Sequence, residues 1–257
     1  MTLSKYQKHS RLMVAHNFLT LQHKPDIKLS KSLYIILLSK QKKGGVQMQT
    51  QCFVKWQKDE ADNFYRDGTI LQYGKSWNLL GNVILLNPGS AKPMDEKPMN
   101  AYLKEHDPYF DDDGEYFAFN VDPLMCSLVS LFKQKYPDGG TIRIYNLFNL
   151  KNAKSGDALE IFANISKNRY AMTPIERVDF HNAPVIIATG KNVHAHPKLE
   201  EQLQRFIAKT PAENLYAITR KDKSTFLIEK AVPNENGLVE NYHPSYSCKY
   251  GNTTKWS

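Results

Sequence analysis

The sequence predicts an α/β fold, a three-layer αβα sandwich with a mainly parallel central sheet. Two observations lead to this prediction. From residue 80 onward, short apolar segments alternate with amphipathic ones, which is the pattern of parallel strands joined by crossover helices. Polar or small residues also follow three of the apolar segments directly, at 87, 146 and 189. Because parallel strands end at the same edge of a sheet, these residues are expected to meet there.

Four segments are expected to be strands of this sheet: 83–86, 141–145, 185–188 and 215–218. The runs at 83–86 and 185–188 are continuously apolar, which is typical of strands buried on both faces. The first run stops at Asn87-Pro88-Gly89-Ser90, where proline removes a backbone donor and glycine permits close approach of the backbone. We therefore expect a strand followed by a sharp turn.

Helices are predicted between the strands by the spacing of apolar residues, at 123–136, 155–170, 172–181 and 199–207. The stretch 91–120 is different, because it is polar and aromatic without a clear period. We expect it to be a long irregular loop. Such loops inside compact domains commonly serve function.

Residues 1–56 are predicted to form a basic N-terminal extension, with a helix at 6–22 and a hairpin of 33–38 with 46–56, ahead of an α/β domain at 57–257. Residues 1–60 contain eleven Lys and Arg against three Asp and Glu, whereas the remainder contains 23 of each. The whole net charge of +8 therefore belongs to this end of the chain. It can serve to capture nucleic acid or to solubilise the chain, and both interpretations stay open.

The composition is that of a soluble globular protein, with 41% hydrophobic and 23% charged residues. The three cysteines, Cys52, Cys126 and Cys248, are scattered and form neither a disulfide framework nor a zinc spacing. No stretch has the apolar length of a signal peptide or a membrane span. We expect a cytoplasmic protein that is a monomer and does not bind membranes.

Four short motifs occur in an order that resembles the uracil-DNA glycosylase superfamily. Asn87-Pro88-Gly89 follows the first core strand, Asn146 ends a later strand, VIIATGK occupies 185–191, and HPSYS occupies 243–247. Together they span about two-thirds of the chain. Each motif alone is weak, whereas four in order are moderately specific. The segments LLGNVILLNPGSAKP and YNLFNLKN also resemble a poorly characterised bacterial and phage family with an NPSTAD-like motif.

This resemblance implies a monofunctional DNA glycosylase with Asn87 and His243 as catalytic residues. The reaction passes through an oxocarbenium-like sugar while negative charge builds on the departing base. Asn87 matches the water-positioning asparagine of the mismatch-specific branch; its amide is no base but can orient a water. His243 matches the histidine that donates to the base oxygen. No motif places a lysine for Schiff-base chemistry, so no lyase activity is expected, and neither a cofactor nor a metal.

Further motif residues are expected to hold the base. Asn146 matches the asparagine that reads the edge of the extruded base, although a turn after a strand would explain it equally well. Phe110, or else Tyr109, is expected to stack on the base, unless these rings belong to the core. The turn and loop residues around the pocket complete the expected substrate site, namely Pro88, Gly89, Ser90, Gly190 and Lys191.

Gly89 is the position with the clearest implication for specificity. The uracil-specific branch of the superfamily carries a bulky aromatic there, which excludes substituents at C5 of a pyrimidine. A glycine predicts tolerance of 5-substituted or enlarged bases. One such base is a glucosylated cytosine, which a host would remove as a defence against phage.

Double-stranded DNA with a modified or mismatched base is the expected partner. Pro244 and Ser245 would pinch a phosphate, Tyr246 or Tyr250 would fill the space left by the flipped base, and Lys249 would lie near the backbone. The sequence departs from the superfamily here, because a tyrosine stands where a Pro-Leu pair would supply the wedge.

Several alternatives stay open. The protein can be a non-catalytic, base-sensing nucleic-acid-binding protein or a hydrolase of free nucleosides or nucleotides. Asp107 or Asp111 can supply the carboxylate that Asn87 lacks. The histidines at 181, 194 and 196 lack the carboxylate or cysteine spacing of a metal site. Three cysteines are too few for the iron–sulfur branches of the superfamily.

Overall fold

The computed structural model describes residues 49–152, 155–245 and 253–257. All of them belong to the second of the two units into which the chain divides, Met48–Ser257. The helix expected at 6–22 and the strand expected at 33–38 lie outside the described residues. Within the described part of the chain, no helix has both the length and the apolar character needed to cross a membrane.

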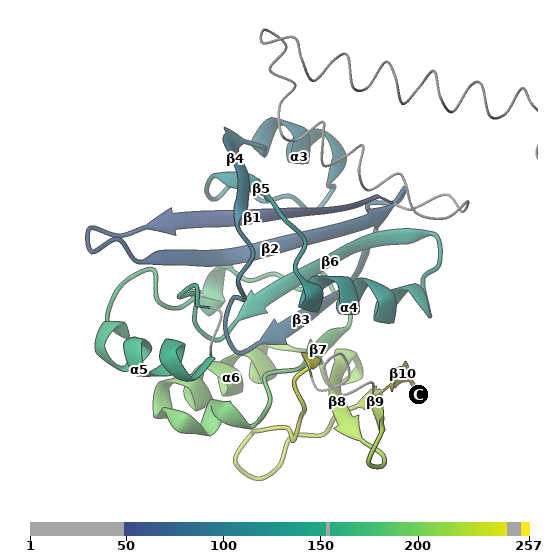
Figure 1. Ribbon diagram of the computed structural model, residues 1–257. Helices are drawn as coiled ribbons and strands as arrows, with labels where there is room; N and C mark the ends of the chain where they lie inside the picture. The colour runs from purple at the N-terminus through teal and green to yellow at the C-terminus, as the bar shows by residue number, and fades with distance from the viewer. Residues whose placement is uncertain (1–48, 153–154, 246–252) are drawn as a thin grey trace, which may run out of the picture. The chain divides into compact units, whose positions relative to one another are not determined.

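A single mixed sheet of ten strands forms the centre of this unit, in the order β10-β9-β8-β7-β3-β6-β2-β1-β5-β4 (Figure 1). The strands are β1 (Thr50–Lys58), β2 (Phe64–Gly74), β3 (Leu79–Leu85), β4 (Pro93–Pro98), β5 (Tyr116–Phe119), β6 (Gly139–Asn146), β7 (Val185–Ile187), β8 (Leu215–Arg220), β9 (Thr225–Lys230) and β10 (Thr253–Trp256). The helices are α3 (Asn100–His106), α4 (Pro123–Lys133), α5 (Ser155–Ile165) and α6 (Pro197–Lys209), with short 3-10 turns η1 (Ile175–Arg177), η2 (Lys191–Ala195) and η3 (Ala212–Asn214).

The centre of the sheet is parallel. The neighbouring strands β6, β3, β7 and β8 run in one direction. On one side, β2, β1, β5 and β4 continue the sheet with antiparallel pairings. On the other side, β9 is antiparallel to β8, and β10 is parallel to β9. The prediction of an α/β fold is therefore confirmed, whereas the prediction of a mainly parallel sheet is not. The outer strands are antiparallel because short turns, such as the one between β1 and β2, can join only antiparallel strands.

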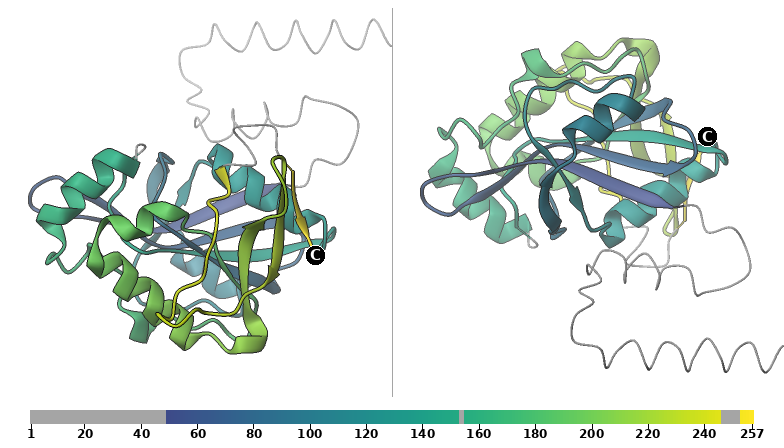
Figure 2. Two further views of the ribbon diagram at one scale, coloured as in Figure 1. Left: turned by 90° about the horizontal axis from the view of Figure 1, so that it is seen from below. Right: turned by 90° about the horizontal axis from the view of Figure 1, so that it is seen from above.

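Both faces of the central strands are buried under helices. In β3 and the residue after it, Ile84 and Leu86 pack in one cluster with residues of α5 and α6, whereas Val83 and Leu85 pack in another with residues of α4. Figure 2 shows helices on both sides of the strands. Each fully buried side chain of this kind contributes roughly 1.5–3 kcal/mol, so the strand that precedes the Asn87 turn is firmly fixed.

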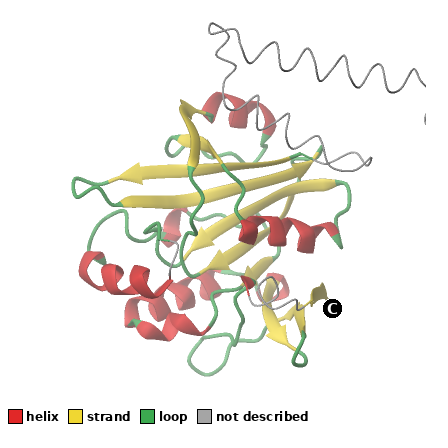
Figure 3. Cartoon of the chain, in the orientation of Figure 1, coloured by secondary structure: helices red, strands yellow, loops and turns green. Residues whose placement is uncertain are grey.

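The stretch 91–120 is more ordered than expected. It contains β4, α3 and β5, visible in Figure 3 as two strands and a helix at one end of the sheet. The strand β4 escaped prediction because it is an exposed edge strand, with Asp95, Glu96 and Lys97 between two prolines. Such charges and prolines are typical of sheet edges and hide the apolar alternation. Conversely, the helix expected at 172–181 is reduced to η1, and β9 and β10 were not expected.

The chain order of the parallel strands defines where a ligand is expected. After β3, the chain forms β6 on one side of β3 and then crosses over to form β7 on its other side. The strand order therefore changes direction at β3 and β7. Open α/β sheets bind ligands outside the carboxyl ends of the strands at such a switch point.

Candidate functional site

Three of the motifs meet at the carboxyl ends of the parallel strands, as the sequence predicts. Leu85 of β3 lies opposite Asn146 of β6, and Ile84 lies opposite Ile187 of β7. Asn87, Asn146 and Gly190 therefore follow or end three adjacent strands at one edge of the sheet. We call this edge the carboxyl edge.

A small pocket opens between the Asn87 turn and the start of α4, with enclosed room for about one water molecule. Apolar side chains from β3, β6 and α4 form its wall. Its polar groups belong to Arg66, Asn87, Asp122 and Asn146, and Pro88 and Gly89 also line it. The combination of an apolar wall with a few convergent polar groups is typical of ligand sites.

Asn87 is held tightly in this pocket, with 8% of its surface exposed. Its Nδ2 donates hydrogen bonds to the carbonyl oxygens of Pro88 (3.0 Å) and Asn152 (3.2 Å). These two bonds fix the plane of the amide. They also tie the turn after β3 to the segment that follows β6.

Asp122 is a carboxylate of the pocket that sequence reasoning missed. It is the N-cap of α4: its Oδ1 accepts a hydrogen bond from the Met125 N–H (2.9 Å), and Pro123 follows as the first helical residue. Its other oxygen, Oδ2, faces Gly89. Among the described residues, Asp122 is the only carboxylate that lines the pocket. An Asp-Pro pair before apolar residues at helical spacing is a helix-start signal. Helix capping alone is therefore enough to explain an aspartate at this position.

The reason for a glycine at position 89 is the approach of this carboxylate. A Cβ on Gly89 would lie 2.8 Å from Asp122 Oδ2, which is closer than real Cβ contacts come. The expectation of open space beside Gly89 is therefore not met at its α-carbon, because Asp122 occupies that side. Tolerance of enlarged bases stays a prediction.

Arg66 brings an unpartnered cation to the pocket. The residue is 3% exposed, and among the described residues its Nε and Nη1 find no hydrogen-bond partner. Its guanidinium lies 5.6 Å from the centre of the Phe119 ring. Each unsatisfied buried donor costs roughly 1–3 kcal/mol, so the arrangement is costly for stability and indicates a role in binding.

His243 is anchored at the carboxyl edge by Gly190 and Asn241. Gly190 has a positive φ of 72°, and a Cβ on it would lie 3.1 Å from the His243 Cβ. The Gly190 N–H donates to Asn241 Oδ1 (2.7 Å), and the Tyr242 N–H donates to the Ile218 carbonyl of β8 (2.8 Å). A glycine is required at 190 both for the left-handed backbone and for this contact.

The His243 ring is held in one protonation state. Its Nδ1 accepts a hydrogen bond from the Ser245 N–H (3.2 Å) and lies 2.9 Å from the Ser245 hydroxyl. The proton of the neutral ring therefore belongs on Nε2. Burial lowers the pKa of His243 from its ordinary value of 6.5 to about 4, so the ring is neutral at pH 7. His243 does not line the Asn87 pocket; it lies against Gly190, which follows β7, and β7 is on the other side of β3 from β6.

Tyr109 and Phe110 do not line the Asn87 pocket. Arg143 in β6 holds their loop, since its Nη2 donates to Asp107 Oδ2 (2.6 Å) and to the Tyr109 carbonyl (2.7 Å). Phe110 packs against Tyr116 in a third apolar cluster. Asp107 forms an ion pair with Arg143, and Asp111 is an exposed residue outside the pocket.

The remaining predicted residues have varied placements. Ser90 and Lys191 are exposed near the carboxyl edge, and Ser245 contacts His243. The expected DNA contacts Tyr246, Lys249 and Tyr250 lie outside the described residues.

The three histidines considered for a metal site each contact a different part of the protein. His181 packs against Tyr109, His194 bonds Glu200, and His196 caps α6. Over the described ranges, no three His, Cys, Asp or Glu side chains group as metal ligands do.

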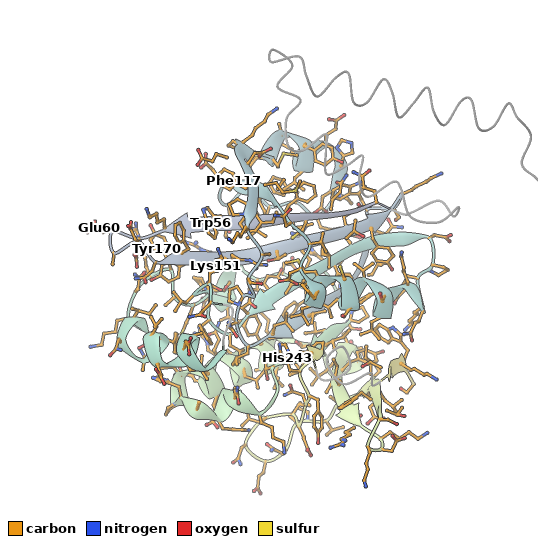
Figure 4. All side chains as sticks on the ribbon, in the orientation of Figure 1. Trp56, Glu60, Phe117, Lys151, Tyr170 and His243 are labelled. Atoms are coloured by element: carbon orange, nitrogen blue, oxygen red, sulfur yellow. The ribbon has the colours of Figure 1, made fainter. Side chains whose placement is uncertain are left out.

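Aromatic and basic residues of β1, β2 and the segment after β6 lie at the same edge. Trp56 stacks on Phe64 with ring centres 4.7 Å apart, and Lys151 Nζ lies 5.3 Å from the Trp56 ring centre. Figure 4 shows Trp56 and Lys151 near each other and apart from His243. These residues were missed because Trp56 and Lys151 lie 95 positions apart and match no motif.

Comparisons with known proteins find no matching family model, no similar curated protein and no similar solved structure. The geometry of the carboxyl edge is therefore the basis for inferring function.

Proposed function

We propose that the protein is a DNA glycosylase that hydrolyses the N-glycosidic bond of a flipped, modified or mismatched base. The observation that carries this proposal is the state of His243. A neutral imidazole with its proton on Nε2 is a hydrogen-bond donor suited to a base oxygen that gains negative charge. Its anchoring against Gly190 places it at the switch point of the sheet, where a ligand is expected.

The Asn87 pocket supplies the groups that a hydrolytic step requires. A water attacks C1′ of the sugar as the bond to the base breaks, and the bonding electrons leave with the base. Asp122 accepts the proton of this water, and Asn87 orients it. Arg66 donates to the oxygen atoms gathered there. Asp122 thus takes the role for which Asp107 and Asp111 were considered, with its Oδ2 beside Gly89 at the pocket.

The substrate class follows from the same groups. Asn146 is 2% exposed and lines the pocket, where its amide can read both a donor and an acceptor on a base edge. In this proposal the partner is double-stranded DNA in the cytoplasm, and a 5-substituted cytosine such as a glucosylated one is a candidate base. The central parallel strands, with helices on both faces, would correspond to the three-layer core of the uracil-DNA glycosylase superfamily, with the antiparallel strands as additions.

The test is direct measurement of base release. Duplexes containing uracil, mismatched thymine, hydroxymethylcytosine or glucosylated cytosine are incubated with the protein, and the free base is quantified by mass spectrometry. We expect release from at least one duplex and a loss of roughly 10²-fold or more in His243→Ala, which removes the donor. Asp222→Asn, in the exposed turn between β8 and β9, is the control and should release base like the parent protein.

Two other outcomes would contradict the proposal. Binding of a modified duplex without release of any base would identify a base sensor. Release from free nucleosides alone would identify a nucleoside hydrolase.

A further inference from the structure

Three aromatic side chains on one face of the sheet are only half-buried. Trp56 of β1 and Phe64 of β2 stack with ring centres 4.7 Å apart, and both are partly exposed. Phe117 of β5 and Trp56 pack at the margin of the apolar cluster that contains the buried side chains of α4. Figure 4 shows Phe117, Trp56 and Lys151 near one another. We call Trp56, Phe64, Phe117, Lys92 and Lys151 the Trp56 patch.

The two lysines of the Trp56 patch form no ion pair with a carboxylate among the described residues. Lys151 Nζ lies 5.3 Å from the ring centre of Trp56, and Lys92 is exposed. Burial lowers the pKa of Lys151, and the positive charges of Lys92 and Arg66 lower it further. Positive charge therefore gathers at the patch without a negative partner.

The charges change at the end of the patch. In the turn between β1 and β2, Lys58 pairs with Asp62 at 2.7 Å, and both residues are exposed. This pair marks the outer limit of the unpaired positive charge.

The Trp56 patch adjoins the Asn87 pocket. Trp56 lies directly opposite Arg66 in the pairing of β1 with β2, so the two side chains share one face of the sheet. Phe119 links them, because its ring centre lies 5.4 Å from that of Trp56 and 5.6 Å from the Arg66 guanidinium. Arg66 in turn lines the pocket. A ligand that reaches the pocket therefore has the Trp56 patch beside it.

The composition of the patch favours nucleic acid over a protein partner. Half-exposed rings with unpaired lysines are typical of surfaces that bind single-stranded nucleic acid, because bases stack on the rings and amines contact the phosphates. Protein–protein interfaces are instead depleted of lysine. In a duplex the bases stack on one another, so only an unpaired strand offers the face of a base to Trp56.

We propose that the Trp56 patch binds a single strand of DNA that leads into the Asn87 pocket, with one base stacked on Trp56 and the Lys151 amine on a phosphate. The choice of DNA rests on the proposed function. Strand binding itself requires no release of a base.

The contact between Lys151 and Trp56 is weak enough to be exchanged for a stacked base. A cation over an exposed ring is worth roughly two- to fivefold in an equilibrium constant, whereas a base stacked on an aromatic side chain is worth roughly five- to 150-fold. A base can therefore displace the amine from the ring. The flexible stem of the lysine then lets the amine turn to a phosphate.

The test is titration of the full-length protein with an unmodified thymidine strand of about 12 nucleotides, a length within the site sizes of single-strand binders. The anisotropy of a dye on the strand gives the affinity, and tryptophan fluorescence reports stacking. We expect binding that quenches the fluorescence. In Trp56→Leu the quenching should be lost, and the affinity should fall roughly five- to 150-fold.

The charge of Lys151 is tested separately. Lys151→Met keeps an apolar stem against Trp56 but removes the amine. The affinity should fall, and the slope of log affinity against log salt should become smaller by about 0.7, which is the value for one phosphate contact on a single strand. This variant decides the question by itself if Trp56→Leu does not fold.

Two matched controls make the result specific. Trp256→Leu changes a half-buried tryptophan of β10, and Lys223→Met changes an exposed lysine in the turn between β8 and β9. Both should bind the strand like the parent protein. Every variant retains the basic N-terminal extension, so a difference in affinity belongs to the substituted residue. Thermal melting checks that each variant is folded.

Three results would overturn the proposal: no strand binding by the parent protein, unchanged affinity in folded Trp56→Leu, or an unchanged salt slope in folded Lys151→Met. The second result would leave the patch to a different partner, such as a protein. An unmodified thymidine strand contains no modified or mismatched base, so none of these results depends on glycosylase activity. Failure of strand binding and failure of the proposed function are therefore distinguishable.

Discussion

Charged side chains are arranged differently in two regions of the sheet. On the antiparallel side of the sheet, opposite charges form ion pairs: Arg143 pairs with Asp107 at 2.6 Å, and Lys55 pairs with Asp113 at 2.7 Å and Asp67 at 3.3 Å. At the carboxyl edge, Arg66 and Asp122 line one pocket but form no ion pair with each other. Paired charges serve the fold, whereas charges left to face a pocket are available to a ligand.

The largest effect is expected from Asp122→Asn. Asparagine caps a helix as well as aspartate does, so the bond to the Met125 N–H and the stability should be retained. Loss of the proton acceptor should lower the rate of base release about 10²–10⁴-fold. The measurement is the single-turnover rate together with the melting temperature. An unchanged rate would show that Asp122 is a cap and nothing more.

A large effect on stability is expected from Asp107→Asn. This change leaves the Arg143 guanidinium, 8% exposed, without its negative partner. Removing one member of a buried ion pair costs about 3–5 kcal/mol. The free energy of unfolding in urea measures the loss. A change below 1 kcal/mol would contradict the view that this pair serves the fold.

Arg66→Met tests the other half of the comparison, and a smaller effect of opposite sign is expected. The substitution removes buried donors that lack partners in the described structure. Stability should stay the same or rise by up to roughly 1–3 kcal/mol. Base release should nevertheless fall. Destabilisation as large as in Asp107→Asn would mean that Arg66 also serves the fold, and the two regions would not differ.

The smallest effect concerns pH. The folded-state pKa of His243, about 4, lies below its ordinary value of 6.5, so protonation favours the unfolded chain. This group should leave stability unchanged above pH 6.5 and reduce it as the pH falls from 6.5 toward 4. Unfolding curves at pH 7 and pH 5 for the parent protein and His243→Gln measure the difference. Equal pH dependence in the two proteins would place the titration elsewhere.

The parallel centre of the fold could be predicted because its strands are buried on both faces. The runs at 83–86 and 185–188 are apolar throughout, 141–145 is apolar at every second residue apart from its tyrosine, and their polar ends share one edge. The antiparallel strands were harder to predict. Lys55 and Arg66 are buried charges inside strands, and their partners or ligands become visible only when the chain is folded.

The same reasoning explains the errors at the site. Tyr109 and Phe110 are aromatic residues in a polar stretch, and composition does not tell which end of the sheet such a stretch reaches. The answer depends on Arg143, whose anchoring of that loop has no sequence signal. Asp122 was missed because helix capping is a sufficient reason for an aspartate before Pro123. Lys151 was missed because it belongs to none of the motifs.

The segment between Asn146 and Lys151 imposes a length requirement on this protein. Leu147, Phe148 and Leu150 are each at most 3% exposed, so the core holds the segment along its whole length. One end carries the amide that lines the pocket, and the other carries Lys151, whose Nζ lies 5.3 Å from the Trp56 ring centre. An insertion of one residue here would leave β6 intact but move the amine relative to Asn87. Chain length between two side chains, as much as their identity, is therefore a property on which this site depends.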